Sequence, residues 1–203
     1  MGSLLAKIDI WNSALDMLKE MPVASTSDQS PVAAYLSRNY NQQRDYLLER
    51  ANWKFAITRA LIPASTQVPA WGWSYLYSLP TDCLKPLQPT YDGTFMGTPI
   101  PYEIESDANG VVSILMSVNA PLRLRYVRRV TNEGLFSNGF AELLATRLAG
   151  KMAHWMTGKA TMADNLAREY KQVFDDVTHT EALTLSGGTY YDTDIADVHE
   201  SFY

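Results

Sequence analysis

The chain is poor in the residues from which covalent and metal-bound sites are built. Its 203 residues include one cysteine, Cys83, and three histidines, His154, His179 and His199. A lone cysteine excludes an intramolecular disulfide and a cysteine-based metal cluster, and it fits folding in a reducing cytoplasm. The histidines stand far apart and form no HxxxH or HExxH spacing. We therefore predict no metal and no cofactor.

Long apolar runs, a secretion signal and a strong excess of one charge are also missing. No apolar stretch has spanning length, so we expect no membrane helix and no membrane partner. The formal net charge is −5, whereas a protein that grips nucleic acid needs clustered Lys and Arg to neutralise phosphates. A mildly acidic surface repels DNA, which suits a smooth conduit better than a gripping site.

Motifs for common catalytic chemistry are absent as well. The sequence contains no GxSxG, no Walker A loop and no GxGxxG. Cys83 follows a turn proline, which favours a small buried residue over a nucleophile. Glu103 and Glu105 alternate on a predicted strand and so share a face, as the two carboxylates of a glycosidase can flank a sugar. We predict a protein that is not an enzyme, and keep a cell-wall polysaccharide hydrolase using Glu103 and Glu105 as the alternative.

Apolar residues recur at helical spacing in four segments. These are residues 4–19, 31 to about 55, 139–157 and 160–179. Ser30-Pro31 supplies the second segment with an N-cap and a first-turn proline. Gln43 interrupts the apolar stripe of that segment, so we expect a neighbour that offers it a hydrogen-bond partner.

Between the second and third helical segments the period changes to two, which indicates strands. The predicted strands are residues 73–79, 98–105, 111–116 and 122–128. Asn109-Gly110 supplies turn chemistry between the second and third of them. In the last strand, Leu122, Leu124 and Tyr126 should face the core while Arg123 and Arg125 face outward.

The sequence therefore predicts an α+β protein with a helical half and an antiparallel β half. The helical half comprises residues 1–62 and 134–181, the β half residues 63–133, and an extended C-terminal arm residues 182–203. We expect three aromatic residues to join the two halves: Trp53, Phe55 and Trp73.

Two surface features are candidate contact sites. The basic cluster Arg123, Arg125, Arg128 and Arg129 can pair with acidic groups of a neighbouring subunit, which we favour, or touch DNA phosphates. The second reading would make the chain a DNA-binding module. The C-terminal arm mixes aromatic and acidic residues without a period, which predicts a segment that orders on a partner. Its expected anchors are Tyr190, Tyr191, Phe202 and Tyr203.

A series of short motifs runs along the chain in order. It comprises Asn12-Ser13-Ala14-Leu15, Trp53-Lys54-Phe55-Ala56, Tyr77-Ser78-Leu79-Pro80-Thr81-Asp82-Cys83-Leu84, Tyr102-Glu103-Ile104-Glu105 and Leu124-Arg125-Tyr126-Val127. Each motif is unspecific, but the ordered series is not, and it extends over roughly residues 4–180. The series resembles tail tubular protein A, the head-to-tail adaptor family of short-tailed phages.

The resemblance implies an antiparallel bundle of about four helices that carries an inserted β module. It also implies assembly as a dodecameric ring, with the portal protein above and the tail nozzle protein below, through which double-stranded DNA passes without sequence specificity. Such a protein is made in the host cytoplasm and sits in the virion at the head–tail junction. The resemblance carries over no catalytic residue. The short, acidic and aromatic C-terminus departs from it and leaves the partner of the arm open.

Overall fold

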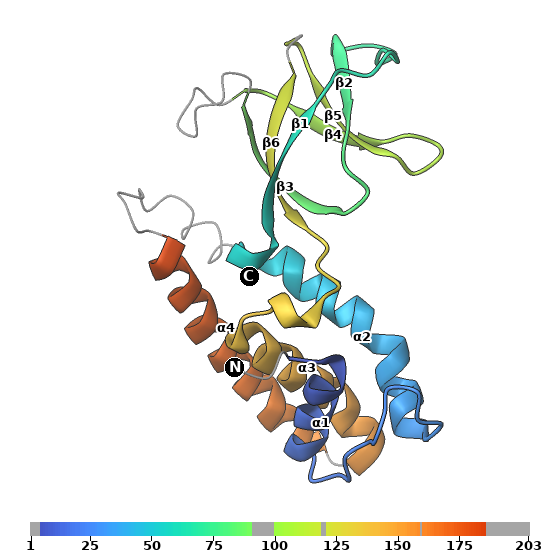
Figure 1. Ribbon diagram of the computed structural model, residues 1–203, viewed down its shortest axis with the longest axis vertical. Helices are drawn as coiled ribbons and strands as arrows, with labels where there is room; N and C mark the ends of the chain where they lie inside the picture. The colour runs from blue at the N-terminus through green and yellow to red at the C-terminus, as the bar shows by residue number, and fades with distance from the viewer. Residues whose placement is uncertain (1–4, 91–99, 119–120, 159, 186–203) are drawn as a thin grey trace.

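The computed structural model describes residues 5–90, 100–118, 121–158 and 160–185 (Figure 1). These residues form a mixed α+β structure with four α-helices and two small antiparallel sheets. The α-helices are α1 (Lys7–Met17), α2 (Pro31–Arg50), α3 (Asn138–Thr157) and α4 (Ala160–Leu185), with short 3₁₀ helices η1 (Lys54–Ala56) and η2 (Glu133–Leu135). The strands are β1 (Ile57–Ile62), β2 (Tyr75–Ser78), β3 (Cys83–Thr90), β4 (Glu103–Ser106), β5 (Val112–Met116) and β6 (Leu122–Arg128).

Helix α2 begins where the sequence predicts. The Ser30 side chain accepts a hydrogen bond from the backbone N–H of Ala33, and Pro31 occupies the first helical position. The predicted helix is too long at its other end. Ala51 is extended, with φ −143° and ψ 164°, so α2 ends at Arg50 and the chain turns toward the sheets.

Helix α3 is the centre of the helical part and contacts α1, α2 and α4. Its predicted inner stripe is buried at Phe140, Leu144, Leu148 and Met152, whereas Trp155 at the end of that stripe is 52% exposed. The expectation for Gln43 is confirmed. Its side-chain oxygen accepts a hydrogen bond of 2.7 Å from Nε of Arg147 on α3.

Residues 57–62, assigned to the helical half on sequence, form strand β1 instead. Every residue of β1 pairs with β6 in antiparallel register. The segment also shows a two-residue period, because Arg59 and Leu61 are exposed while Ile62 is buried. Pairing with β6, about sixty or more residues further along the chain, decides the conformation of residues 57–62. The residues close to the segment in sequence do not reveal that partner.

Strand β3 was also missed, and its prolines explain why. Pro86 and Pro89 lack the N–H that a central strand needs, which argues locally against a strand. In the sheet order β1-β6-β3, however, β3 lies at an edge, and its pairing with β6 shifts register between Pro86 and Pro89. An edge strand with a bulge tolerates both prolines. We call this sheet A.

Sheet B has the order β2-β5-β4 and packs against sheet A (Figure 1). The core between the two sheets is formed by Ile62, Tyr77, Ile114, Met116, Leu122, Leu124 and Tyr126. The predicted inward positions of β6 are therefore confirmed. The turn between β4 and β5 lies where Asn109-Gly110 predicts it, and Gly110 has a φ of +79°.

The helical part and the sheets share a boundary at the lower end of sheet A. Val127 of β6 and the following Val130 belong to the core of the helical part, and Leu84 of β3 packs against that core. At the C-terminal end, residues 182–185 continue α4 and are not extended as predicted. A 26-residue helix running on from Ala160 places the start of any arm after Leu185.

Candidate functional site

Two residues of the predicted aromatic joint, Trp53 and Phe55, pack in the core of the helical part, where α2, η1, η2 and α3 meet. Trp53 is fully buried, and its ring lies edge-on to Phe140 with centroids 4.9 Å apart. Phe55 contacts Phe140 at 5.1 Å and Phe136 at 5.5 Å. The indole N–H of Trp53 donates a hydrogen bond of 2.7 Å to the carbonyl of Leu47. That carbonyl belongs to the last turn of α2, where backbone carbonyls have no hydrogen-bond donor within the helix. Trp53 therefore caps the end of α2 and also packs α2 on α3.

Trp73 does not belong to this joint. Its indole N–H donates a hydrogen bond of 2.7 Å to a carboxylate oxygen of Glu103 on β4. It therefore connects the loop before β2 to the edge of sheet B. The alternating pattern around Trp73 correctly predicted a strand, β2, which begins two residues later. A side chain beside a strand contacts neighbouring strands of its own sheet more readily than a distant helix, which explains the contact of Trp73 with β4.

The carboxylate of Asp45 links α2 to the strands. Asp45 accepts hydrogen bonds at one oxygen from Nε and Nη2 of Arg44, at 2.8 and 2.7 Å. Its other oxygen pairs with Nε of Arg129, immediately after β6, at 2.9 Å. The Arg44 side chain is only 6% exposed. Arg129, predicted as part of a contact surface, is thus engaged within the chain.

The predicted basic cluster is divided by the two-sided geometry of β6. Arg123 and Arg125 project from the outer face of sheet A, opposite the core between the sheets. Arg128 is half-buried and pairs in register with Cys83 on β3. Arg59 of β1, which is not part of the predicted cluster, lies directly across from Arg125. The alternation of residues 57–62 was the signal that could have revealed it.

We call Arg59, Leu61, Arg123 and Arg125 the basic face. Leu61 lies directly across from Arg123 in the register of β1 and β6. Its side chain is 64% exposed, and Arg59 and Arg123 are exposed as well. The face therefore combines positive charge with one projecting apolar side chain.

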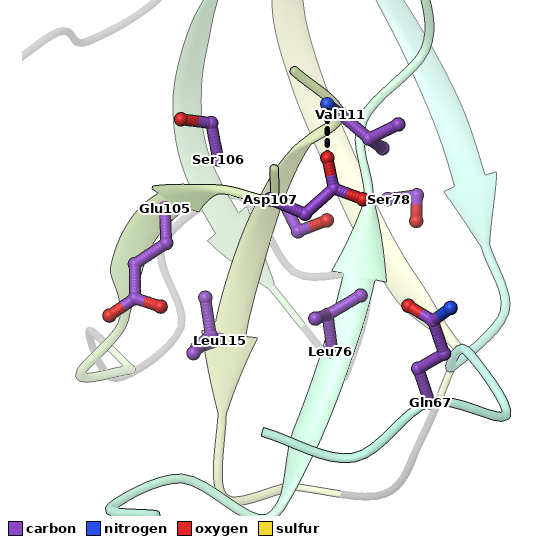
Figure 2. Close-up of a pocket in the computed structure, with 9 residues that line it drawn as sticks. Gln67, Leu76, Ser78, Glu105, Ser106, Asp107, Val111 and Leu115 are labelled. Atoms are coloured by element: carbon purple, nitrogen blue, oxygen red, sulfur yellow. Dashed lines mark hydrogen bonds between the residues drawn. The ribbon is translucent and has the colours of Figure 1, made fainter. Parts of the chain in front are cut away.

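The outer face of sheet B carries the opposite charge. Glu103 and Glu105 alternate along β4 and are both exposed, as predicted for one strand face. Figure 2 shows Glu105, Leu115 and Leu76 side by side across β4, β5 and β2, with Gln67 of the preceding loop beside them. They line a hollow of about 90 Å³ that Asp107 also borders. We call Glu103, Glu105, Asp107, Leu76 and Leu115 the acidic face.

The size of this hollow bears on the hydrolase alternative. Small-molecule sites usually enclose about 300–1,000 Å³, and the hollow beside Glu105 encloses about 90 Å³. One carboxylate oxygen of Glu103 already accepts a hydrogen bond from the indole N–H of Trp73. The geometry favours a contact surface over a site for a polysaccharide.

Asp82 forms a small polar cluster with Cys83 and Tyr126. The Tyr126 hydroxyl donates a hydrogen bond of 3.1 Å to a carboxylate oxygen of Asp82. Burial, and then this hydrogen bond and the charge of Asp82, raise the pKa of Tyr126 to about 12. Burial and the charge of Asp82 raise the pKa of the Cys83 thiol to about 11. Both shifts extend the neutral forms of these groups further into the alkaline range.

We expect Cys83 to react slowly with alkylating reagents in the folded protein. A rise in pKa from 9.0 to about 11 lowers the thiolate fraction near pH 8 about a hundredfold.

The raised pKa values of Cys83 and Tyr126 also make the stability of the fold depend on pH. The folded state retains protons that the unfolded state loses, so the stabilisation is complete below pH 9 and declines as the pH rises toward 12.

These expectations are measured by iodoacetamide labelling with and without urea, and by urea unfolding between pH 8 and 12. Tyr126→Phe should flatten the upper part of the alkaline decline. Rapid labelling of folded protein at pH 8 would contradict the protonated, sheltered thiol.

The described residues also bear on metal sites and membrane helices. No group of three or more His, Cys, Asp and Glu side chains there could hold a metal ion. None of the helices described has the length and apolar character needed to cross a membrane. The sequence matches no protein-family model and no curated protein.

Proposed function

We propose that the protein is a virion structural protein, a head-to-tail adaptor of a short-tailed phage. Twelve copies form a ring between the portal protein and the tail nozzle protein. The ring continues the DNA channel and serves genome retention and ejection. The proposal includes no enzymatic step, cofactor or membrane contact.

The order of the elements is the observation that carries the proposal. Two helices precede the strands and two follow them, and α3 contacts all of the other helices. We interpret this order as an antiparallel helical bundle with an inserted β module, the architecture that the resemblance to tail tubular protein A implies. The packing of Val127, Val130 and Leu84 against the helical core and the Asp45–Arg129 pair support a fixed angle between the two parts, which a ring subunit needs in order to repeat one contact.

In this proposal the helices pack laterally in the ring and the β module projects toward the next component of the tail. The protein is made in the host cytoplasm and becomes part of the virion at the head–tail junction. A net charge of −5 suits a passage through which DNA slides without sequence-specific contacts.

Electron microscopy of the protein mixed with its cognate portal, beside the protein alone, tests the proposal. We expect a twelvefold ring stacked on the portal. Portal particles that remain bare at saturating protein would overturn the adaptor function. Imaging the protein alone controls for rings that form without the portal.

The C-terminal arm gives a second test. Its predicted anchors, Tyr190, Tyr191, Phe202 and Tyr203, lie outside the described residues. Because α4 ends at Leu185, deletion of residues 186–203 should leave the fold intact and weaken binding to the portal or to the neighbouring subunit. Circular dichroism checks the fold, and sedimentation with portal measures binding.

A matched variant separates the aromatic anchors from the length of the arm. Replacing the four anchors by serine should reproduce the deletion, whereas Asp192→Asn with Asp194→Asn should bind nearly normally. Portal binding and ring formation unaffected by the deletion would exclude the arm as an anchor.

A further inference from the structure

The two outer faces of the β part point in opposite directions. Sheet A contributes Leu122, Leu124 and Tyr126 to the shared core, and sheet B contributes Tyr77, Ile114 and Met116. Side chains alternate along a strand, so the intervening residues lie on the far side of each sheet. The basic face and the acidic face therefore lie on opposite sides of one two-layer unit.

The basic face contains an arrangement that the fold itself does not favour. Arg59 and Arg125 are directly opposite on β1 and β6, and like charges at such positions destabilise a strand pair. Arg59 forms no ion pair with any other described residue. Together with Arg123, this pair concentrates positive charge on the outer face of sheet A, which a partner surface of negative charge would complement.

The acidic face supplies that charge, and its shape matches as well. Glu103 and Glu105 stand about 7 Å apart along β4, as residues i and i+2 of a strand do, and Arg123 and Arg125 have the same spacing on β6. Leu61 projects from the basic face, and the hollow beside Glu105 is lined by Leu76, Val111 and Leu115. A volume of about 90 Å³ admits one aliphatic side chain.

We propose that the basic face of one copy docks on the acidic face of the next, with Leu61 entering the hollow between Leu76, Leu115 and Glu105. Two different faces of the same chain then meet, which is the heterologous contact that closes into a ring or extends as a filament. The proposal names a subunit contact of the proposed ring and in that respect rests on the proposed function.

Two observations favour a second copy over nucleic acid as the occupant of the basic face. An exposed leucine stands among the arginines, and phosphate groups give it no apolar partner. The complementary charges and the hollow are both present on the same chain, whose net charge is −5. The basic face spans two short strands and the acidic face three, so we expect the contact to be one part of a larger interface.

Charge reversal tests the contact. Arg59→Glu or Glu105→Arg alone places charges of the same sign on both sides of the contact between the basic face and the acidic face. We expect assembly to weaken roughly tenfold or more, with a greater loss at low salt, where the repulsion is less screened. Both reversals in one chain restore opposite charges and should restore assembly. An equimolar mixture of the two single variants should also associate. When the two variants alternate, the acidic residue introduced by Arg59→Glu meets the basic residue introduced by Glu105→Arg, and the unchanged Arg59 meets the unchanged Glu105.

The measurements are sedimentation velocity of the chain alone and microscopy of rings on the cognate portal. Lys19→Glu and Glu20→Arg are matched controls, because both sites are exposed in the loop after α1, outside the helices and the two faces, and the charge changes are the same. Thermal unfolding shows that the variants fold. Arg59→Glu should be at least as stable as the wild type, because a glutamate opposite Arg125 replaces a like-charge pair.

A cross-link gives an independent readout. In a Cys83→Ser background, Leu61→Cys combined with Ser78→Cys places one thiol on the basic face and one beside the hollow. Oxidation should give a ladder of covalent oligomers, whereas either cysteine alone should stop at dimers.

The outcomes separate this contact from the adaptor function. Rings that form on the portal despite both single reversals, and without a cross-link ladder, overturn the contact and leave the adaptor proposal standing. Oligomers that are sensitive to both reversals but ignore the portal support the contact and overturn the adaptor function. Loss of salt-dependent DNA binding in Arg59→Glu, with assembly unchanged, assigns the basic face to nucleic acid and overturns the contact.

Discussion

Replacing Trp53 by alanine is expected to lower the free energy of unfolding by about 3–5 kcal/mol. The side chain is fully buried against Phe140 and Phe55, so alanine leaves a large cavity at the meeting point of the helices. The carbonyl of Leu47 also loses its hydrogen bond. Domains are usually stable by about 5–15 kcal/mol, so the variant should be near the threshold of folding. Urea denaturation followed by circular dichroism measures the change.

Two further variants identify the source of the loss. Trp53→Phe keeps most of the ring contacts but leaves the Leu47 carbonyl unpaired, so we expect a smaller loss of about 1–3 kcal/mol. Trp71→Ala is the matched control, because Trp71 is 86% exposed and its removal should change stability by less than about 0.5 kcal/mol. Equal effects of Trp53→Ala and Trp71→Ala would show that the joint does not hold the helices together.

Replacing Asp45 by alanine is expected to lower the unfolding free energy by about 2–4 kcal/mol. The loss arises mainly at Arg44, whose buried guanidinium would lose the carboxylate oxygen that accepts two of its hydrogen bonds. The Arg129 side chain is 42% exposed, and its share of the loss should be small and reduced by salt. Urea denaturation at low and high salt distinguishes the two contributions.

Glu49→Ala is the control for Asp45→Ala, since it removes an exposed carboxylate from the same helix. Arg129→Met should be milder than Asp45→Ala, because it leaves Arg44 paired. A larger effect of Arg129→Met would mean that the link to the strands matters more than the buried arginine.

The features of the fold that sequence predicts well are those fixed by neighbouring residues. Ser30-Pro31 starts α2 through the capping of one turn, and the alternation of residues 122–128 sets which side of β6 is buried. Strands β1 and β3 were not predicted because their conformation depends on pairing with β6, which lies outside both segments. The alternation of residues 57–62 is a local sign of β1, whereas the two prolines of β3 argue locally against a strand. Tertiary pairing overrides local preference in β3.

The candidate surfaces follow the same division. Arg123 and Arg125 were placed outward by a two-residue period that needs no partner. Arg129 follows immediately after β6, where that period ends, and only the packing of α2 brings Asp45 to it. Arg59 became part of the basic face when residues 57–62 joined the sheet. Whether Arg59 and Arg129 belong to a surface or to an internal ion pair is therefore determined by contacts between distant segments.

The position of the strands between α2 and α3 has a consequence for synthesis on the ribosome. Helices α1 and α2 are translated first, but their buried side chains, such as Trp11 and Leu36, share a core with α3. Roughly a hundred residues separate the end of α2 from the end of α3, which at 5–20 residues per second takes about 5–20 s. During that interval the two nascent helices lack the element that covers them, so the helical part folds after translation of α3 and chaperones have time to act.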